Sequence, residues 1–403
     1  MALTRNHRLR LTGAVTAVST AAVLSATLLP TKAVATEERI VGAGSPGAVG
    51  NSFIVTLKSG SDGVDASSEA GKDLARKYGA KVGHTYTSAL NGYAVKVDEA
   101  QAKLLAADPM VASVTQDTEI SIDGTQKNPP SWGLDRIDQP SLPLNNSYSW
   151  PDSAGSGVKA YVIDTGVRTS HADFGGRATS GHDFVDQDNV ADDGNGHGTH
   201  VAANIAGSSH GVAKKADIVA VRVLDDEGSG TTAQVIAGID WVAKHAQKPA
   251  VANMSLGGVA NPQLDEAVRN AIASGVTFAV AAGNDGVPAD LFSPARVSEA
   301  ITVGATDRSD NRASFSNWGS KVDLFAPGVD ITSAWNSSDS ATKTISGTSM
   351  ATPHTVGAAA LHLADHPTAS PADVGKALTA KAASGKVKNP GLTSPNLLLQ
   401  VNN

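Results

Sequence analysis

At positions 158 to 166 the chain reads Val158-Lys159-Ala160-Tyr161-Val162-Ile163-Asp164-Thr165-Gly166, an almost continuous apolar run that ends on a carboxylate. Such a run is typical of a strand that is buried on both faces, as strands of parallel sheets are. Further runs of this kind follow along the chain: Ile218 to Leu224, Val251 to Leu256 and Val276 to Ala282. Together the runs predict the centre of one large sheet.

Helical patterns alternate with these runs. The clearest has Pro262 in its first turn, an apolar stripe along one side and Gly275 directly after its end. Strands that alternate with helices indicate an α/β fold with a doubly wound parallel sheet. In such sheets ligands bind at the carboxyl ends of the strands. Polar residues directly after the apolar runs are therefore the first candidates for a functional site.

A smaller unit with a different order of strands and helices precedes the large sheet. From about residue 51 to 122 the order is strand, helix, strand, strand, helix, strand, with a period-two stretch at Tyr93 to Val97 and a helical stripe at Glu99 to Ala107. This order predicts a ferredoxin-like α+β unit. A core of about 70 residues is marginal, so we expect this unit to depend on a partner surface. The polar loop Asp123 to Ser131 separates the two units.

The N-terminus has the features of a secretory signal peptide. Basic residues between Arg5 and Arg10 precede an uncharged stretch from Leu11 to Pro30, and Ala33-Val34-Ala35 is a small-x-small cleavage site. The alternative is an anchoring helix, because about 20 apolar residues can span a bilayer. Thr, Ser and Gly dilute this stretch, however, and no later segment is apolar enough to span. We therefore expect residues 1–35 to be removed and the mature product to be extracellular.

Composition excludes several classes of protein. The 403 residues carry a formal charge of −7 and no dense basic run, which argues against binding nucleic acid through clustered Lys and Arg. The chain has no cysteine, so a disulfide framework, a Cys-ligated zinc and a thiol nucleophile are excluded. Any covalent chemistry is left to Ser, Thr, Lys or a carboxylate.

Two glycine-containing motifs suggest other enzyme classes. Gly207-Ser208-Ser209-His210-Gly211 matches the G-x-S-x-G elbow of esterases, but a helical stretch precedes it and a strand follows, which is the reverse of the required order. Gly228-Ser229-Gly230-Thr231-Thr232-Ala233 lies between a strand and a helix, as a dinucleotide-binding loop does. Acidic residues at 225–227 directly precede it and would repel a pyrophosphate. A nucleotide-dependent enzyme is therefore only a weak alternative.

Three other residues predict nucleophilic chemistry. Asp164 ends the first apolar run, His197 stands between glycines at the start of a small-residue helix, and Ser349 opens a second small-residue helix. A neutral imidazole can take the serine proton while the carboxylate fixes its tautomer and stabilises the imidazolium that forms. The helix N-terminus also favours developing negative charge. The three residues together predict acyl transfer.

Asn284 is the fourth candidate, directly after the apolar run Val276 to Ala282 and Gly283. Its side-chain amide can donate to the oxyanion of a tetrahedral intermediate, alongside the backbone N–H of Ser349. Taken singly, an Asp after a strand or an Asn after a Gly is more often a turn former. The combination of all four residues is far more specific.

Three signatures resemble those of the subtilisin-like serine proteases: Val162-Ile163-Asp164-Thr165-Gly166, Gly196-His197-Gly198-Thr199-His200-Val201-Ala202 and Gly347-Thr348-Ser349-Met350-Ala351-Thr352-Pro353-His354. The triad of subtilisin follows the same chain order, Asp, His, Ser. From Trp132-Gly133-Leu134-Asp135-Arg136-Ile137-Asp138 onward the chain is similar to the proteinase K and aqualysin branch. By this resemblance the smaller unit is a propeptide that acts as chaperone and inhibitor. The expected boundaries are 1–35 for the signal peptide, 36–124 for the propeptide and 125–403 for the peptidase domain.

The resemblance also implies a substrate cleft. Two extended segments would hold a substrate strand by backbone hydrogen bonds: Gly228, Ser229 and Gly230, and Ser255, Leu256 and Gly257. Glycine suits this role because another backbone can approach it closely. A wide primary pocket, tolerant of apolar or aromatic residues, would be lined by Ala281, Ala282 and Gly283.

Four residues depart from the family pattern in the helices that carry His197 and Ser349. Ala203-Asn204 stands where Gly-Thr is usual, and Thr355-Val356 stands where Val-Ala is usual. An added methyl or polar group at a tight helix contact costs about 1–3 kcal/mol through overpacking. A catalytically inactive, propeptide-bound subtilase that acts as a binding protein is therefore an alternative. By the resemblance, His200 and His354 are structural residues.

Carboxylates crowd the loop before His197: Asp183, Asp186, Asp188, Asp192 and Asp193. They repel one another unless they are solvated or bound to a cation, and hard oxygen ligands favour calcium. The resemblance implies structural calcium at three places: Asp183 with Asp188, the carbonyls of Ser298 and Ala300 with the carboxylate of Asp323, and Asp135 with Asp138 and Gln139. The last is weakened because Asn145 stands where a carboxylate is usual. Solvated acidic loops are the alternative at each place.

The sequence therefore predicts a secreted serine endopeptidase, made as an autoprocessed preproprotein, that forms an acyl-enzyme on Ser349. Its expected partners are polypeptide substrates and its own propeptide. We expect it to bind no nucleic acid and, after signal cleavage, no membrane. We also expect a monomer without an organic cofactor.

Overall fold

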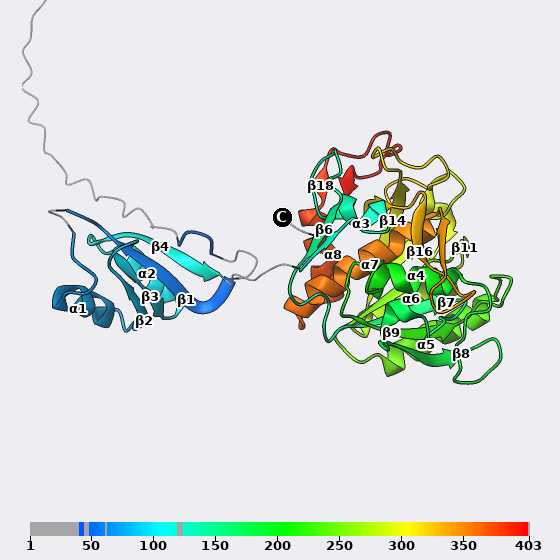
Figure 1. The fold of residues 1–403 in the computed structure, drawn as a ribbon, viewed down its shortest axis with the longest axis horizontal. Coiled ribbons are helices and arrows are strands. Elements are labelled where there is room, and N and C mark those ends of the chain that lie inside the picture. The colour runs from blue at the N-terminus through cyan, green and yellow to red at the C-terminus, as the bar shows by residue number, and fades with distance from the viewer. Residues whose placement is uncertain (1–39, 44–47, 61–62, 119–123, 402–403) are drawn as a thin grey trace, which may run out of the picture. The chain divides into compact units, whose positions relative to one another are not determined.

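The chain divides into two compact units, Met1–Ile120 and Ser121–Asn403. The computed structural model describes residues 40–43, 48–60, 63–118 and 124–401, and Figure 1 draws both units. The predicted signal peptide at 1–35 lies outside the described residues. Within the ranges that the structure describes, no helix is long and apolar enough to cross a membrane.

The first unit is a four-stranded antiparallel sheet with two helices. Its elements follow the predicted order: β1 (Ala48–Leu57), α1 (Glu69–Lys77), β2 (Lys81–Tyr86), β3 (Gly92–Lys96), α2 (Glu99–Ala106) and β4 (Val111–Thr118). Ser68 and Asp98 begin the two helices by accepting hydrogen bonds from the backbone N–H groups of Gly71 and Gln101. The strand order β2-β3-β1-β4, with neighbours antiparallel, confirms the predicted ferredoxin-like architecture.

The core of the first unit is small. Phe53, Val55 and Leu57 alternate inward along β1, as the period of two requires, whereas β2 is exposed along nearly its whole length. The described residues of this unit form a single apolar cluster between sheet and helices. The unit therefore has little apolar area with which to offset its chain entropy.

The second unit is built on a nine-stranded sheet. Its strand order is β18-β19-β15-β14-β12-β10-β7-β9-β8. The strands are β7 (Lys159–Asp164), β8 (Ala178–Asp183), β9 (Asp217–Arg222), β10 (Ala250–Met254), β12 (Thr277–Ala281), β14 (Ile301–Thr306), β15 (Leu324–Pro327), β18 (Ala383–Ser384) and β19 (Leu397–Leu398). All pairs from β8 to β19 are parallel, and only β18 runs antiparallel.

The strand order reverses beside β7. β8 and β9 lie on one side of β7, whereas β10 and the strands that follow it lie on the other side. A doubly wound sheet binds its ligand at such a switch point, outside the carboxyl ends of the strands. Asp164 ends β7 at this point.

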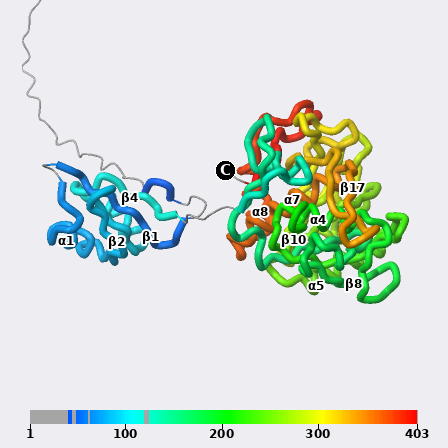
Figure 2. Tube along the Cα trace, viewed as in Figure 1, coloured from blue at the N-terminus to red at the C-terminus, as the bar shows by residue number. Residues whose placement is uncertain are grey.

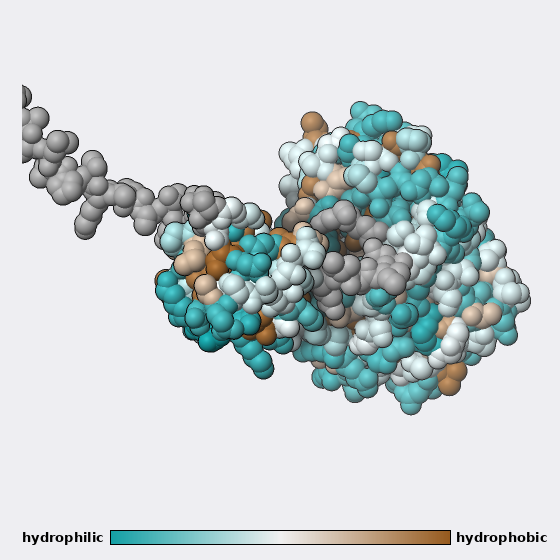
Figure 3. All heavy atoms as spheres, turned by 60° about the vertical axis from the view of Figure 1, so that its left-hand side comes forward, coloured by the Kyte–Doolittle hydropathy of each residue, from teal (hydrophilic) through white to brown (hydrophobic). Residues whose placement is uncertain are grey.

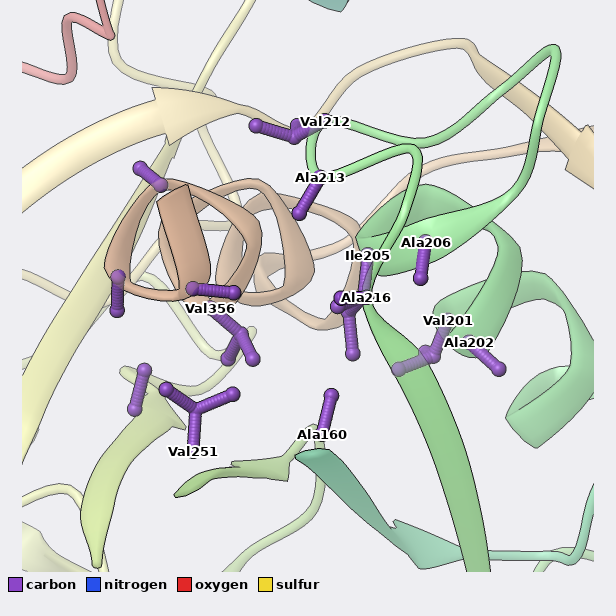
Figure 4. Packing of buried hydrophobic residues seen from close by; sticks show 14 of the residues in the cluster. Ala160, Val201, Ala202, Ile205, Ala206, Val212, Ala213, Ala216, Val251 and Val356 are labelled. Atoms are coloured by element: carbon purple, nitrogen blue, oxygen red, sulfur yellow. The ribbon is translucent and has the colours of Figure 1, made fainter. Parts of the chain in front are cut away.

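Helices cover both faces of the sheet, which confirms the predicted doubly wound fold (Figure 1). α4 (His197–Ala206) and α7 (Thr348–Asp365) share a core cluster with Ala160 and Val162 of β7. α5 (Thr232–His245) and α6 (Pro262–Ala273) share a second cluster with Tyr161 and Ile163. Because successive strand residues point to opposite faces, β7 is buried on both sides. Figure 4 shows side chains of the first cluster, including Ala160, Ile205 and Val356.

Short elements complete the second unit. The helical ones are α3 (Trp132–Ile137), α8 (Pro371–Lys381) and two 3-10 turns, Ala172–Phe174 and Ala289–Leu291. Three two-stranded sheets pair β5 (Gly124–Lys127) with β6 (Ser147–Trp150), β11 (Gly258–Val259) with β13 (Phe292–Ser293), and β16 (Ile331–Ala334) with β17 (Thr342–Ile345). The chain trace in Figure 2 shows α7 beside α4 at the centre of the unit. Hydrophilic side chains predominate on the face of this unit that Figure 3 shows.

Candidate active site

Two of the predicted catalytic residues are in contact. Asp164 is fully buried at the end of β7, and His197, whose side chain is 25% exposed, is the first residue of α4. Nδ1 of His197 lies 2.7 Å from Oδ1 of Asp164. The backbone N–H of Thr165 also donates to this oxygen at 2.8 Å, which orients the carboxylate. Because the carboxylate engages Nδ1, the other imidazole nitrogen, Nε2, is left to act on a substrate or nucleophile.

The environment of His197 favours its charged form. Burial of the ring opposes protonation, but attraction to Asp164, the hydrogen bond with that carboxylate and the charge of Asp193 outweigh it. The net result is that the pKa of His197 lies above its ordinary value. A raised pKa makes the imidazole a better proton acceptor, as a general base requires.

Asp193 holds the two catalytic elements together, a role that our sequence analysis missed. One oxygen accepts from Oγ1 of Thr165, next to Asp164, at 2.9 Å and from the N–H of Gly196 at 2.7 Å. The other accepts from the N–H and the hydroxyl of Thr199 in the first turn of α4. The sequence places Asp193 only within the acidic cluster before His197. The signal for its true role is its place just before a helix, where carboxylates accept from free backbone N–H groups.

Ser349 is the second residue of α7 and is held against β10. Its hydroxyl donates to the carbonyl of Ser255 at 3.2 Å, and the hydroxyl of Ser255 donates to the carbonyl of Ser349 at 2.8 Å. Among the described residues no hydrogen bond joins Ser349 to His197. Such bonds are often long before substrate binds. Ser255, the hydrogen-bond partner of Ser349, lines the same cleft as His197.

Asn284 is oriented as an oxyanion donor would be. Its Oδ1 accepts from the N–H and the hydroxyl of Thr348, at 2.8 and 2.9 Å, which leaves its amide nitrogen to donate to another group. A methyl group on Gly347 would lie 3.7 Å from this nitrogen and 3.6 Å from the backbone nitrogen of Ser349. The two N–H donors therefore flank one small space, as stabilisation of an oxyanion requires.

A cleft of about 580 Å³ runs from His197 along the two predicted binding segments. Its lining includes all six predicted residues: Gly228, Ser229, Gly230, Ser255, Leu256 and Gly257. A side chain at Gly230 would meet the carbonyl of Val223 at 2.3 Å, so glycine is required there by packing as well as by access. Glu227 lies at the acidic rim of this cleft.

The three residues predicted to line the primary pocket lie at and after the end of β12. Ala281 ends β12, and Gly283 has φ +103°, where a side chain would collide with Asn317. The side chain of Ala282 is fully buried in a core cluster with Phe325, its N–H donates to Val303 and its carbonyl accepts from Asn317. Ala282 could therefore contribute to a pocket only through its backbone, and the pocket stays a prediction.

The departures from the family pattern lie in the packed interior. Ala203 and Val356 are fully buried in the cluster between α4 and α7. Nδ2 of Asn204 lies 3.3 Å from Nδ1 of His200, but Oδ1 of Asn204 and the hydroxyl of Thr355 have no partner among the described residues. A buried unsatisfied polar group costs about 1–3 kcal/mol. We therefore expect Asn204 and Thr355 to cost stability unless water reaches these two oxygens.

Asp183, one of the two predicted calcium ligands before α4, already has partners within the chain. Arg222 donates to Asp183 at 2.7 Å, and also to the exposed Asp186 and Asp226. The remaining oxygen of Asp183 accepts from two backbone N–H groups, and the side chain of Asp188 is solvent-exposed. The guanidinium group thus supplies one positive charge where calcium was predicted. One charge offsets only one of the carboxylates, so calcium at Asp183 with Asp188 stays a prediction.

At the other two predicted calcium sites, the carboxylates have no salt-bridge partner among the described residues. Asp323 is half-buried with one backbone donor, Thr302, and partial burial raises its pKa to about 6 although the charge of Lys321 opposes the shift. Asp138 is also half-buried, and partial burial together with the charge of Asp135 raises its pKa to about 6. Oδ1 of Asp138 has no partner among the described residues. Hard oxygen groups without a positive partner fit calcium, although no cluster of three or more His, Asp or Glu able to hold a metal occurs in the described ranges.

Family comparisons match both units. The Subtilase family matches residues 155–396, and the Peptidase inhibitor I9 family matches residues 52–123. The first match spans more than half of the chain, so the chain belongs to the subtilase family. It is a serine protease with an inhibitor domain ahead of its peptidase domain, as the sequence predicted.

Individual relatives agree with this assignment. An extracellular serine proteinase of Thermus sp. (strain Rt41A) is 55% identical over 321 residues, which cover 80% of this chain and 78% of that protein. Proteinase R of Parengyodontium album is 42% identical over 357 residues, covering 87% and 88%. The crystal structure of a cold adapted subtilisin-like serine proteinase is 55% identical, with a TM-score of 0.66 over 68% of this chain and 98% of that one. The predicted extracellular location is thereby confirmed.

Proposed function

We propose that this extracellular protease is an endopeptidase that cleaves peptide bonds through an acyl-enzyme on Ser349, with Asp164 and His197 completing the triad. The observation that carries this proposal is the 2.7 Å hydrogen bond between His197 and the buried Asp164, beside the cleft to which Ser255 connects Ser349. That arrangement is the base and its orienting carboxylate in an acyl-transfer site.

The reaction follows from the positions of these groups. Ser349 exchanges its hydrogen bond with the Ser255 carbonyl for one with Nε2 of His197, which takes the proton as Oγ attacks the substrate carbonyl. Asp164 stabilises the imidazolium, and the N–H groups of Ser349 and Asn284 bind the oxyanion. The imidazolium then protonates the leaving amine, so the peptide C–N bond breaks and the acyl group remains on Oγ. Water, deprotonated by His197, releases the second product.

The substrate enters as an extended strand. Gly228 to Gly230 and Ser255 to Gly257 expose backbone along the cleft, which supports binding by strand addition. Ala281 and Gly283 are proposed to contribute to the primary pocket. The cleft would therefore recognise a polypeptide substrate mainly by hydrogen bonds to its backbone, which suits an endopeptidase of broad specificity.

The chain is proposed to mature in two steps. Removal of a signal peptide at 1–35 would be followed by cleavage near residue 124, which separates the propeptide 36–124 from the monomeric peptidase 125–403. β5 (Gly124–Lys127) pairs with β6 in the second unit, which supports a boundary at the start of β5. Cleavage is proposed to be autocatalytic, with the inhibitor domain retained at the active site until it is degraded.

Structural calcium is proposed at two sites. Asp323 with the carbonyls of Ser298 and Ala300 would hold one ion, and Asp135, Asp138 and Gln139 would contribute to a second. At both sites the ion would supply the positive charge that the half-buried carboxylates lack. Gln139 already uses its amide to donate to the carbonyls of Ser141 and Pro143, which orients its side chain within this loop.

Labelling with a serine-directed fluorophosphonate tests the proposal. The secreted protein should be labelled at Ser349 and lose peptidase activity in proportion. Ser349→Ala should abolish labelling, lower turnover by about 10⁶-fold and accumulate as the uncleaved precursor. Asn284→Leu, with the nucleophile intact, should still be labelled but lose about 10²–10³-fold in turnover. A folded wild-type protein that resists labelling would instead support a non-catalytic binding protein.

A further inference from the structure

The C-terminal end of α7 carries two adjacent imidazoles that catalysis does not use. His362 lies in the last turn of the helix and His366 is the residue that ends it, so the two are four residues apart on one side of the helix. The N–H of His366 donates to the carbonyl of His362 at 2.9 Å, which fixes the spacing. The ring centroids are 4.6 Å apart and the ring planes are inclined by 44°.

Both rings open into one hollow of about 530 Å³, between the end of α7 and the start of α8. Asp365 and Asp373 line the same hollow. Asp373 is oriented by Ser370, whose hydroxyl donates to its carboxylate at 2.6 Å. Four side chains of the kinds that bind metals therefore border a single solvent-accessible space.

The imidazoles are available as ligands. In the described part of the chain, no hydrogen bond engages a ring nitrogen of His362 or His366. His362 is partly exposed and His366 is exposed, so a ring nitrogen of each can reach an ion from solvent.

The ring spacing matches a shared metal ion. With a metal–nitrogen distance of about 2.0–2.1 Å, each ring centroid lies about 3.2 Å from the ion, and a tetrahedral angle then separates the two centroids by about 5 Å. The observed 4.6 Å is close to this value. Small rotamer adjustments of two partly exposed rings would complete the geometry.

We propose that His362 and His366 form a site for a divalent transition-metal ion such as zinc, completed by water and by the carboxylates of Asp365 or Asp373. No third protein ligand is already in place among the described residues, so the affinity comes mainly from the two-histidine chelate. Imidazole nitrogen selects zinc, copper or nickel over calcium. The site is therefore chemically distinct from the carboxylate sites at Asp138 and Asp323.

Metal binding here would stabilise the helix that carries Ser349. The ion would join the last turn of α7 to the residue that ends it and, through Asp373, to the first turn of α8. A ligand that binds only the folded state raises its stability by mass action. Zinc should therefore raise the melting temperature without entering the catalytic cleft.

The test is zinc titration of the purified secreted enzyme, blocked with a fluorophosphonate to prevent autolysis and metal binding at His197. Calorimetry should give one zinc per chain, and His362→Gln or His366→Gln should each weaken binding at least about tenfold. The matched control is His245→Gln, which removes one exposed imidazole that stacks on Trp241 and should leave binding unchanged. Millimolar calcium should not compete.

Melting temperature provides the second readout. Zinc should raise it by about 2–6 °C in the wild type and not in the double variant His362→Gln/His366→Gln. Absence of zinc uptake by the wild type, uptake that persists in the double variant, or displacement by calcium would each overturn the proposal. Failure of the serine to react with the fluorophosphonate would overturn the proposed function but leave this titration valid.

Discussion

The loop before α4 and the surroundings of Asp138 and Asp323 both concentrate negative charge, but they neutralise it differently. In the loop, Arg222 contacts three carboxylates, and Asp193 is satisfied by two threonines and by backbone N–H groups. Asp138 and Asp323 each have a backbone donor but no salt-bridge partner in the described structure, and partial burial raises the pKa of each to about 6. A dense acidic cluster is therefore weaker evidence of a metal site than a half-buried carboxylate without a counter-charge.

The largest effect is expected where a carboxylate has a catalytic partner. Asp164→Asn keeps the size of the side chain but no longer fixes the tautomer of His197, so turnover should fall by about 10⁴-fold. The matched control is Asp173→Asn, because Asp173 forms a similar buried pair with His210 at 2.9 Å outside the catalytic cleft. Steady-state kinetics on a peptide substrate should show normal turnover for the folded control. Equal losses in both variants would remove the special role of Asp164.

Replacement of Arg222 tests how strongly its guanidinium group stabilises the buried Asp183. Arg222→Met leaves Asp183 buried and unpaired, which costs about 3–5 kcal/mol for a broken buried pair. The melting temperature of the inhibitor-blocked enzyme should fall by about 6–20 °C. Asp226→Asn removes only an exposed partner of the same guanidinium and should cost at most about 1 kcal/mol. If calcium restored the Arg222→Met enzyme fully, the loop would itself be a metal site.

Chelation should affect the other two regions. An ion bound only by the native state contributes about 2.7 kcal/mol at a hundredfold excess over its Kd, so a chelator should lower the melting temperature of the wild-type enzyme. Asp323→Asn and Asp138→Asn should each reproduce part of this loss and become less sensitive to the chelator. Identical melting curves with and without chelator would contradict both proposed calcium sites.

The smallest effect concerns pH. Catalysis needs neutral His197, whose pKa is raised by Asp164, so activity should fall as pH drops through this raised value. In Asp164→Asn, burial lowers the pKa of His197 without the opposing effect of the carboxylate. The residual activity should therefore persist to lower pH than that of the wild type. The same raised pKa stabilises the fold below the unfolded value of His, and this contribution is lost as pH rises through the folded value. Profiles of kcat/KM against pH provide the measurement, and superimposable acid limbs would contradict it.

Local sequence was sufficient to predict the fold class, whereas the roles of the site residues stay predictions. Apolar runs such as Val158 to Ile163 are long enough to identify strands buried on both faces, and the stripe after Pro262 identifies a helix, since both depend on periodicity within a few residues. Asp164, His197, Asn284 and Ser349 each lie at the end of a strand or the start of a helix. Parallel strands bring their carboxyl ends to one edge, so proximity followed from topology.

Partners across strands were decided only by the tertiary structure. Asp183 and Arg222 are 39 residues apart, and the register between β8 and β9 places them side by side. Register, burial and the direction of each side chain determine whether a carboxylate meets a cation, water or nothing. For this reason the sequence supplied the acidic residues but not the guanidinium group that the fold places beside Asp183. Likewise the burial of Ala282 depends on packing between elements, which no local pattern encodes.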